Sequence, residues 1–205
     1  MKMLLLFFST PFFLGACAQE EADHSSGNLE GVQWLAECFS NNGVYQSRTI
    51  TFNGGSYQAQ STIYVGGTTC GTPGVHLVEK GTYVLGDVIS STSSIRKLNK
   101  TYADLSLTPL TQTAANSYNS SSHCGLSNWV MNVPQRILGL NCTGTQMPTI
   151  GMTYYDVFLI WTVDIPGAGI EKGELNFGLF DNVKTGVSEA TRPTSVTSPD
   201  YKRVQ

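Results

Sequence analysis

The chain has 205 residues, of which 40% are hydrophobic and only 13% are charged, and its formal net charge is -3. Average soluble proteins carry about 25% charged residues; here 20 Ser, 22 Thr and 21 Gly take their place. The apolar content argues against a disordered chain, and the weak negative charge argues against a nucleic-acid-binding surface. The length fits a single domain, and all-β domains commonly reach this size.

The N-terminus has the pattern of an export signal. Lys2 precedes an apolar run, Leu4 to Leu14, that is too short for a stable membrane span of about 20 residues. The run ends in Leu14-Gly15-Ala16-Cys17, which resembles the bacterial lipobox. In that family, signal peptidase II cuts before the cysteine and the thiol carries a diacylglycerol. An ordinary secretory signal with an incidental cysteine is the alternative.

The lipobox resemblance implies a lipid-anchored protein of the bacterial cell envelope. We expect residues 1–16 to be the signal peptide, Cys17 to be lipidated, and residues 17–30 to form a flexible tether. The acyl chains on Cys17 would make the lipid bilayer a partner of the chain. Because no Asp follows Cys17, the resemblance to Gram-negative lipoproteins favours the outer membrane.

Four further cysteines, Cys38, Cys70, Cys124 and Cys142, remain after Cys17. An even number in an exported chain indicates disulfides, and four cysteines allow three pairings. We favour Cys38–Cys70 and Cys124–Cys142, because both close short loops. A metal site made of all four thiolates is the alternative, which the absence of a Cys-x-x-Cys spacing disfavours. We therefore predict no metal and no cofactor.

Alternation of apolar and polar residues, which is typical of strands, dominates the chain. In chain order it occurs at residues 32–38, 47–52, 56–65, 75–85, 103–107, 129–133 and 174–179. The segment from Thr153 to Val163 is apolar on both faces, which predicts a central, covered strand. Asn53-Gly54-Gly55 predicts a hairpin turn. The low-complexity segment Thr108 to Ser122 predicts an exposed loop that carries a short helical turn at its alanines.

These patterns predict eight to ten short strands in a sandwich or a barrel, and closure would remove exposed sheet edges. The order of key residues adds a resemblance. The sequence reads Gly31-x-x-Trp34-x-x-x-Cys38, Arg48-x-x-x-Phe52, Tyr64-x5-Cys70 and Gly81-x-Tyr83. This layout resembles the extracellular domains of the vertebrate adenomatosis polyposis coli down-regulated family of Wnt inhibitors. The resemblance implies a single lipocalin-like antiparallel β-barrel over residues 31–205, a bonded Cys38–Cys70 pair and a cavity for a lipid-like ligand.

Motifs of known enzymes are scarce in this sequence. It contains no Gly-x-Ser-x-Gly, His-Glu-x-x-His or P-loop pattern. Its three histidines, His24, His76 and His123, are far apart in the chain. Asp156 and Asp164 are expected on the outward face of one strand, too far apart to act as a pair. We therefore predict no catalytic residues.

Two charged residues fall on apolar faces of predicted strands. Arg48 alternates with Ile50 and Phe52, and Glu79 alternates with Leu77 and Tyr83. Because buried charges are costly unless paired, Arg48 and Glu79 are expected to pair with each other or to bind the polar head of a ligand. The alternatives for Arg48 are a cation–π contact across Trp34 or a position at the rim. For Glu79 the alternative is a register shift near Gly81, which would turn its side chain outward.

Aromatic residues are also expected in the barrel interior. Trp34, Tyr57 and Tyr83 are candidates for the ligand-binding wall, and Trp129, Tyr155 and Trp161 are expected to point inward as well. Together these patterns predict an envelope lipoprotein that binds a small hydrophobic or amphipathic ligand. The alternative is a structural or protein-interaction lipoprotein with a solid core and no ligand. Neither hypothesis identifies a protein partner, and neither involves nucleic acid.

Overall fold

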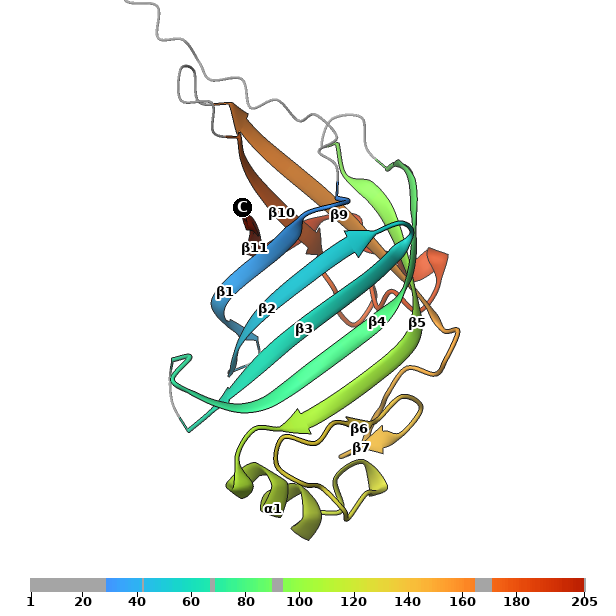
Figure 1. Ribbon diagram of the computed structural model, residues 1–205. Coiled ribbons are helices and arrows are strands. Elements are labelled where there is room, and N and C mark those ends of the chain that lie inside the picture. Colours follow the sequence, from blue (N-terminus) through green and yellow to red (C-terminus); the bar gives the residue numbers. More distant parts are fainter. Residues whose placement is uncertain (1–28, 42, 67–68, 90–93, 165–170, 205) are drawn as a thin grey trace, which may run out of the picture.

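The computed structural model describes residues 29–41, 43–66, 69–89, 94–164 and 171–204 (Figure 1). The predictions for the signal peptide, for lipidation at Cys17 and for His24 concern residues outside this part of the chain. Among the described residues, no helix has the length and apolar character needed to cross a bilayer.

Eight antiparallel strands close into a barrel in which each strand pairs with its neighbours in the chain (Figure 1). The last strand returns to the first, so the spatial order is β1-β2-β3-β4-β5-β9-β10-β11 and back to β1. The strands are β1 (Gln33–Asn41), β2 (Val44–Asn53), β3 (Ser56–Val65), β4 (Thr72–Val88), β5 (Arg96–Pro109), β9 (Thr153–Asp164), β10 (Glu171–Gly178) and β11 (Val196–Val204). This up-and-down closure is the lipocalin architecture, and it confirms the predicted all-β barrel.

The turn chemistry predicted from the sequence sets the first hairpin. Asn53 pairs with Ser56, and Gly54 and Gly55 between them have φ values of 55° and 76°. Side chains with a Cβ rarely adopt such angles, so the two glycines allow the tight turn. The hairpin register places Phe52 opposite Tyr57, with both rings inside the barrel.

One end of the barrel is closed by apolar side chains. Antiparallel pairing brings the start of β1 and the ends of β2 and β11 to this end. Trp34 and Phe52 are 2% and 0% exposed there, and Leu29 covers them from the segment before β1. The indole nitrogen of Trp34 donates a hydrogen bond to the carbonyl oxygen of Leu29 at 3.4 Å. This end therefore forms the main hydrophobic core.

Both favoured disulfides are present, Cys38–Cys70 and Cys124–Cys142. The first joins β1 to the segment that precedes β4. A β-bulge in β1 between Ala36 and Phe39 changes the alternation, so Phe39 rather than Cys38 continues the inward face of Trp34 and Ala36. Cys38 lies exposed at the rim as a result.

The segment between β5 and β9 forms a small lobe at the other end of the barrel (Figure 1). It contains α1 (Gln112–Ser120), the 3-10 turn η1 (His123–Gly125) and the short strands β6 (Gln135–Arg136), β7 (Asn141–Cys142) and β8 (Thr145–Gln146). The predicted loop over 108–122 is wrong at its start, because β5 extends to Pro109, whereas the helical turn expected at its alanines is present as the helix α1. Thr111 caps this helix by accepting a hydrogen bond from the Ala114 backbone N–H at 3.1 Å.

The strand expected at residues 129–133 is also wrong. Trp129 is 2% exposed in the core of the lobe, whereas Met131 and Val133 are exposed in an irregular segment.

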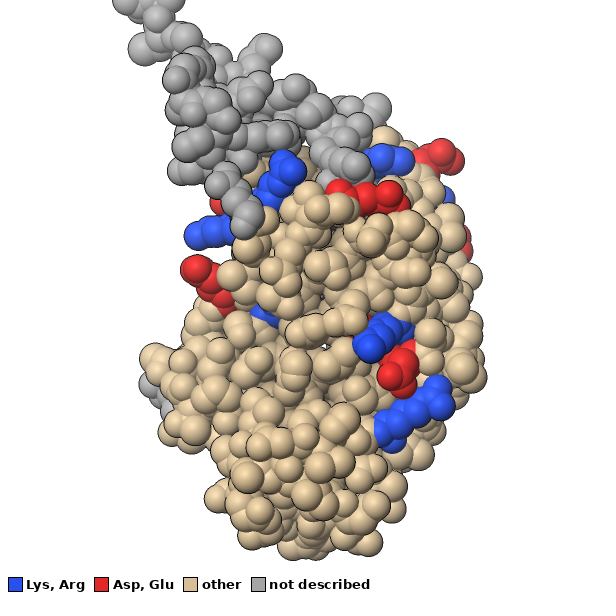
Figure 2. Space-filling model, in the orientation of Figure 1, with Lys and Arg blue, Asp and Glu red and all other residues tan. Residues whose placement is uncertain are grey.

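Residues 105–155 contain a single Lys, Arg, Asp or Glu, which is Arg136. In the view of Figure 2 the lower end of the molecule, where α1 lies, shows no charged side chain. The charges on this face gather over the barrel instead.

The segment from 179 to 195 packs on the outside of β9 and β5, and Arg192 holds it there. Arg192 is 5% exposed. Its guanidinium donates hydrogen bonds to the carbonyl oxygens of Asp156 and Leu98 and to the side-chain oxygen of Asn99 at 2.7 Å. It also pairs with Glu189, which accepts from Lys97 at 2.8 Å.

We expect Glu189 to make part of the stability dependent on acid. Hydrogen bonds from Arg192 and then Lys97 lower the pKa of Glu189 from its ordinary 4.5 to about 2. Because the folded-state pKa is depressed, this contribution is fully present above pH 4.5 and is lost as pH falls through about 2. Glu189→Gln should therefore reduce the loss of melting temperature between about pH 5 and about pH 2. An unchanged pH profile in thermal melts would contradict this assignment.

Candidate functional site

A cavity of about 530 Å3 lies inside the barrel, between the apolar closed end and the opposite rim. It is bounded near the rim by the end of β1, the start of β2, the residues after β10 and the start of β11. Antiparallel pairing places all four at the same end of the barrel, which is also the end where the lobe begins. The lining residues used below are Phe39, Arg48, Ile50, Glu79, Lys100, Tyr102, Tyr154, Asp156, Phe177, Leu179, Phe180 and Tyr201.

Arg48 and Glu79 face each other across the cavity wall, as one of the two sequence-based alternatives predicts. The terminal nitrogen Nη2 of Arg48 donates to Oε2 of Glu79 at 3.2 Å. The side chains are 27% and 12% exposed, and both line the cavity. Arg48 therefore keeps part of its guanidinium open to the cavity while it is paired.

The inward direction of Glu79 depends on where the barrel places a β-bulge. The register between β4 and β5 shifts between Lys80 and Gly81, and the extra residue, Ala103, lies on β5. β4 therefore keeps its alternation, and Glu79 stays on the inward face with Tyr83. A glycine is required at position 81, where β4 passes the bulge in β5, because a Cβ there would lie 2.0 Å from the carbonyl oxygen of Thr101.

A second ion pair, Lys100 with Asp156, lies in the same cavity and was not expected. Nζ of Lys100 is 3.0 Å from Oδ2 of Asp156, and the side chains are 9% and 1% exposed. Oδ1 of Asp156 accepts hydrogen bonds from the backbone N–H groups of Val157 at 2.8 Å and Gly178 at 3.1 Å. The Lys100 ammonium also lies 5.3 Å from the ring centre of Phe177.

The prediction that Asp156 faces outward is therefore wrong, and so is the inward direction expected for Tyr155 and Trp161. The ring of Tyr155 lies under the Arg192 guanidinium on the outside of the barrel, and Trp161 packs against the outer cluster of Val157 and Leu159. β9 is covered on both faces, because the 179–195 segment packs on the outside. The side chain of Asp164 lies outside the described part of the structure.

Phenol groups complete the polar part of the cavity. Tyr102, Tyr154 and Tyr201 line it from β5, β9 and β11. Burial, followed by the nearby Glu79 carboxylate, raises the pKa of Tyr102. Burial, followed by the Asp156 carboxylate, raises the pKa of Tyr154. Both phenols therefore stay protonated at neutral pH and can donate or accept hydrogen bonds.

Three buried polar atoms have no hydrogen-bond partner in the described part of the chain. They are Nε of Arg48, Oε1 of Glu79 and the hydroxyl oxygen of Tyr57. Burial, followed by the charge of Glu79, raises the pKa of Tyr57, so this phenol is also protonated. Unsatisfied buried polar atoms are rare in folded proteins, and here they gather around a single ion pair.

The five predicted ligand-binding residues lie in two places. Arg48 and Glu79 line the cavity, whereas Trp34, Tyr57 and Tyr83 belong to the apolar core beside it. Tyr83 is 6% exposed, and its hydroxyl donates a hydrogen bond to the Glu30 carboxylate.

The cation–π contacts found among the described residues do not include Arg48 over Trp34. The pairing of Arg48 with Glu79 takes its place.

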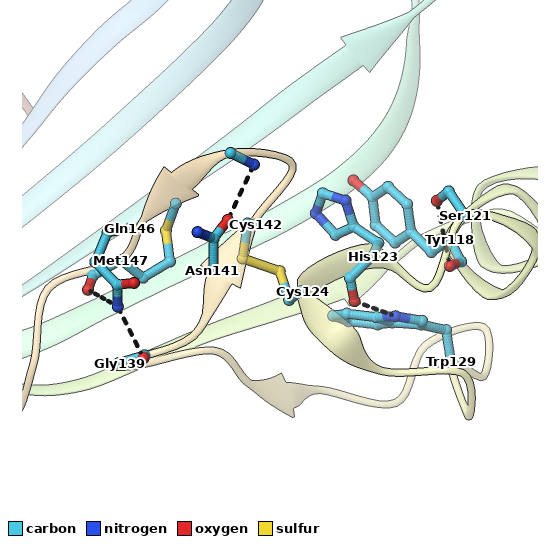
Figure 3. Close-up of a disulfide and its surroundings, with 11 residues drawn as sticks. Tyr118, Ser121, His123, Cys124, Trp129, Gly139, Asn141, Cys142, Gln146 and Met147 are labelled. Atoms are coloured by element: carbon cyan, nitrogen blue, oxygen red, sulfur yellow. Dashed lines mark hydrogen bonds between the residues drawn. A yellow bond between two sulfur atoms is a disulfide. The ribbon is translucent and has the colours of Figure 1, made fainter.

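The lobe holds the group of described residues that most resembles a metal site. Ligand atoms of His123, Cys124 and Cys142 lie within 4.8 Å of one another (Figure 3). The two cysteine sulfurs are bonded to each other, so neither offers a thiolate. His123 stacks on Tyr118 with ring centres 4.2 Å apart, and burial lowers the pKa of His123. This aromatic and disulfide cluster packs the lobe together.

The cavity combines charged and phenolic groups in its interior with both aromatic and polar side chains toward its rim. This arrangement can hold a polar group through Arg48 and the phenols while an apolar segment lies against Phe39, Phe177 and Phe180.

No family model matches the sequence, and no curated protein matches it.

Proposed function

We propose that this protein is a binding protein for a small amphipathic molecule, which it holds inside the barrel. The observation that carries the proposal is the cavity of about 530 Å3 with Arg48 open to it. Its volume falls within the roughly 300–1,000 Å3 typical of small-molecule sites. A cavity of this size supports ligand binding over the alternative of an interaction protein with a solid core.

The position of each type of side chain supports one orientation of the ligand. Arg48 and Tyr102 lie in the interior part, whereas Phe39, Leu179 and Phe180 come from the strand ends near the rim. A polar head group therefore enters first, and the apolar part stays near the rim.

We further propose that the chain is anchored in the bacterial envelope, at the outer membrane, through acylated Cys17. The lipobox resemblance of Leu14 to Cys17 supports this proposal, and two disulfides are consistent with an oxidising compartment. The intact mass of the exported chain tests it. A mass that begins at Cys17 and includes a diacylglyceryl group is expected, and an unmodified cysteine would contradict the anchor.

Photo-crosslinking tests the binding function. The full chain is held in lipid nanodiscs and exposed to a long-chain alcohol that carries a photoreactive diazirine. We expect the probe to label peptides of β9 and β10 that line the cavity, in particular those with Tyr154 and Phe177. Labelling spread over the outer surface, or none at all, would contradict the proposal.

Ile50→Trp tests whether the probe binds inside the cavity. Ile50 lines the cavity, so the larger side chain should fill part of it and reduce labelling several-fold. Thr49→Trp is the control, because Thr49 is the preceding residue of β2 and points to the opposite face. Melting temperatures establish that both variants fold. Equal labelling of the two variants would place the probe outside the barrel.

A further inference from the structure

The charges that line the cavity balance one another completely. Arg48 and Lys100 are its two cations, and Glu79 and Asp156 are its two carboxylates. Each cation is paired with one carboxylate, at 3.2 Å for Arg48 and Glu79 and at 3.0 Å for Lys100 and Asp156. The lining formed by the described residues is therefore electrically neutral, and neither cation awaits a counter-ion.

This balance disfavours a ligand with a charged head. Asp156 already binds Lys100 and two backbone N–H groups, and Lys100 is only 9% exposed. Among the described lining residues, Arg48 is therefore the cation open to a ligand carboxylate, which would have to compete there with Glu79. Displacing Glu79 would leave that carboxylate buried without a partner, which is costly in a low-dielectric interior.

The cavity does offer hydrogen bonds to uncharged oxygen atoms. Among the described residues, the Arg48 guanidinium donates one side-chain hydrogen bond, to Glu79, and its Nε–H has no partner, so it retains N–H donors beside the cavity that its side chain lines. The protonated phenols of Tyr102 and Tyr154 can each donate or accept. A hydroxyl, ester or ether group can use these donors without separating either ion pair.

We propose that the cavity selects amphiphiles whose head group is uncharged and bears oxygen atoms, such as long-chain alcohols and acylglycerols, over fatty acids of the same length. This selectivity rests on the proposed binding function and adds the class of ligand to it. Arg48 binds the head group. Glu79 disfavours a ligand carboxylate, because it already neutralises the charge of Arg48.

A matched pair of photoreactive probes tests this selectivity. An alcohol and a carboxylic acid of equal chain length, each with a diazirine at the same carbon, compete for the full chain in nanodiscs at neutral pH. We expect the alcohol to label the cavity peptides about tenfold more strongly at equal membrane concentration. Equal or stronger labelling by the acid, or by a probe with a zwitterionic head, would overturn the proposal.

Glu79→Gln should abolish the preference for the alcohol. The glutamine side chain can still accept the hydrogen bond from Arg48, but it no longer neutralises its charge, so the acid probe should gain about tenfold. The alcohol probe should change by less than about threefold, because its hydrogen bonds remain. An unchanged ratio of the two probes in a folded Glu79→Gln variant would overturn the role of Glu79.

The double variant Arg48→Met with Glu79→Gln separates this effect from misfolding. It removes both charges together, so labelling by the alcohol should fall because Arg48 no longer binds its head group, but the acid probe gains no unpaired cation and should not overtake the alcohol. A preference for the acid in this variant would contradict the charge argument. Failure of every probe to label the cavity of the wild-type chain would instead refute the binding function itself, so the two failures are distinguishable.

Discussion

Replacing Asp156 with Asn should lower the free energy of unfolding by about 3–5 kcal/mol, because it leaves the Lys100 ammonium buried without its counter-ion. Lys100 is 9% exposed, and Asp156 is its partner at 3.0 Å. The asparagine Oδ1 can keep both backbone hydrogen bonds, but the amide group that replaces Oδ2 cannot neutralise the ammonium. Removing one member of a buried pair is much more destabilising than removing both, since the remaining charge is not solvated.

Urea unfolding measures this effect, and the chain provides two controls. Asp104→Asn removes an ion pair with Arg136 whose side chains are 40% and 58% exposed, so a loss below about 1 kcal/mol is expected. Lys100→Met combined with Asp156→Asn should recover much of the stability that Asp156→Asn loses. If Asp156→Asn is no more destabilising than Asp104→Asn, Lys100 and Asp156 do not form a buried pair.

Replacing Trp129 with Ala should lower the free energy of unfolding by about 3–5 kcal/mol, as for other large aromatic residues in a core. Trp129 is 2% exposed, and its indole N–H donates to the carbonyl oxygen of His123 at 3.2 Å. The cluster around Trp129 includes Leu105 and Leu107 of β5, so the lobe and the adjacent end of the barrel share this core. A single unfolding transition is therefore expected, both for the wild type and for the variant.

Val130→Ala is the matched control for Trp129, because the neighbouring side chain is 54% exposed. Its effect should stay within about 0.5 kcal/mol. Two separate transitions in the Trp129→Ala variant, detected by fluorescence and circular dichroism in the same titration, would contradict a shared core.

The features that the sequence predicts well are those with a local physical cause. Asn53-Gly54-Gly55 defines a hairpin because glycine adopts the required backbone angles. Alternation along β2 and β4 places Arg48 and Glu79 on inward faces, because neither strand has a bulge next to these residues. The preference for short loops gave both disulfides correctly.

The rest of the site depends on tertiary structure that leaves little local signal. The bulges in β1 and β5 each insert one extra residue, so the side chains beyond them that point inward are not those that simple alternation predicts. Phe39 and Tyr102 face the cavity for this reason. β9 is apolar on both faces, so alternation cannot assign Asp156 to the inside. The one available signal was that Asp156 is a charge within an otherwise apolar run, which indicates a buried partner. Lys100 is that partner.

Native mass spectrometry of the full chain, released from nanodiscs after gentle purification, tests the central claim most directly. We expect the wild-type chain to carry one small amphiphile with an uncharged head group, and we expect Ile50→Trp to lose it while Thr49→Trp keeps it. A wild-type chain that has only its unliganded mass, and that takes up neither the alcohol nor the acid probe, would contradict a ligand-binding barrel.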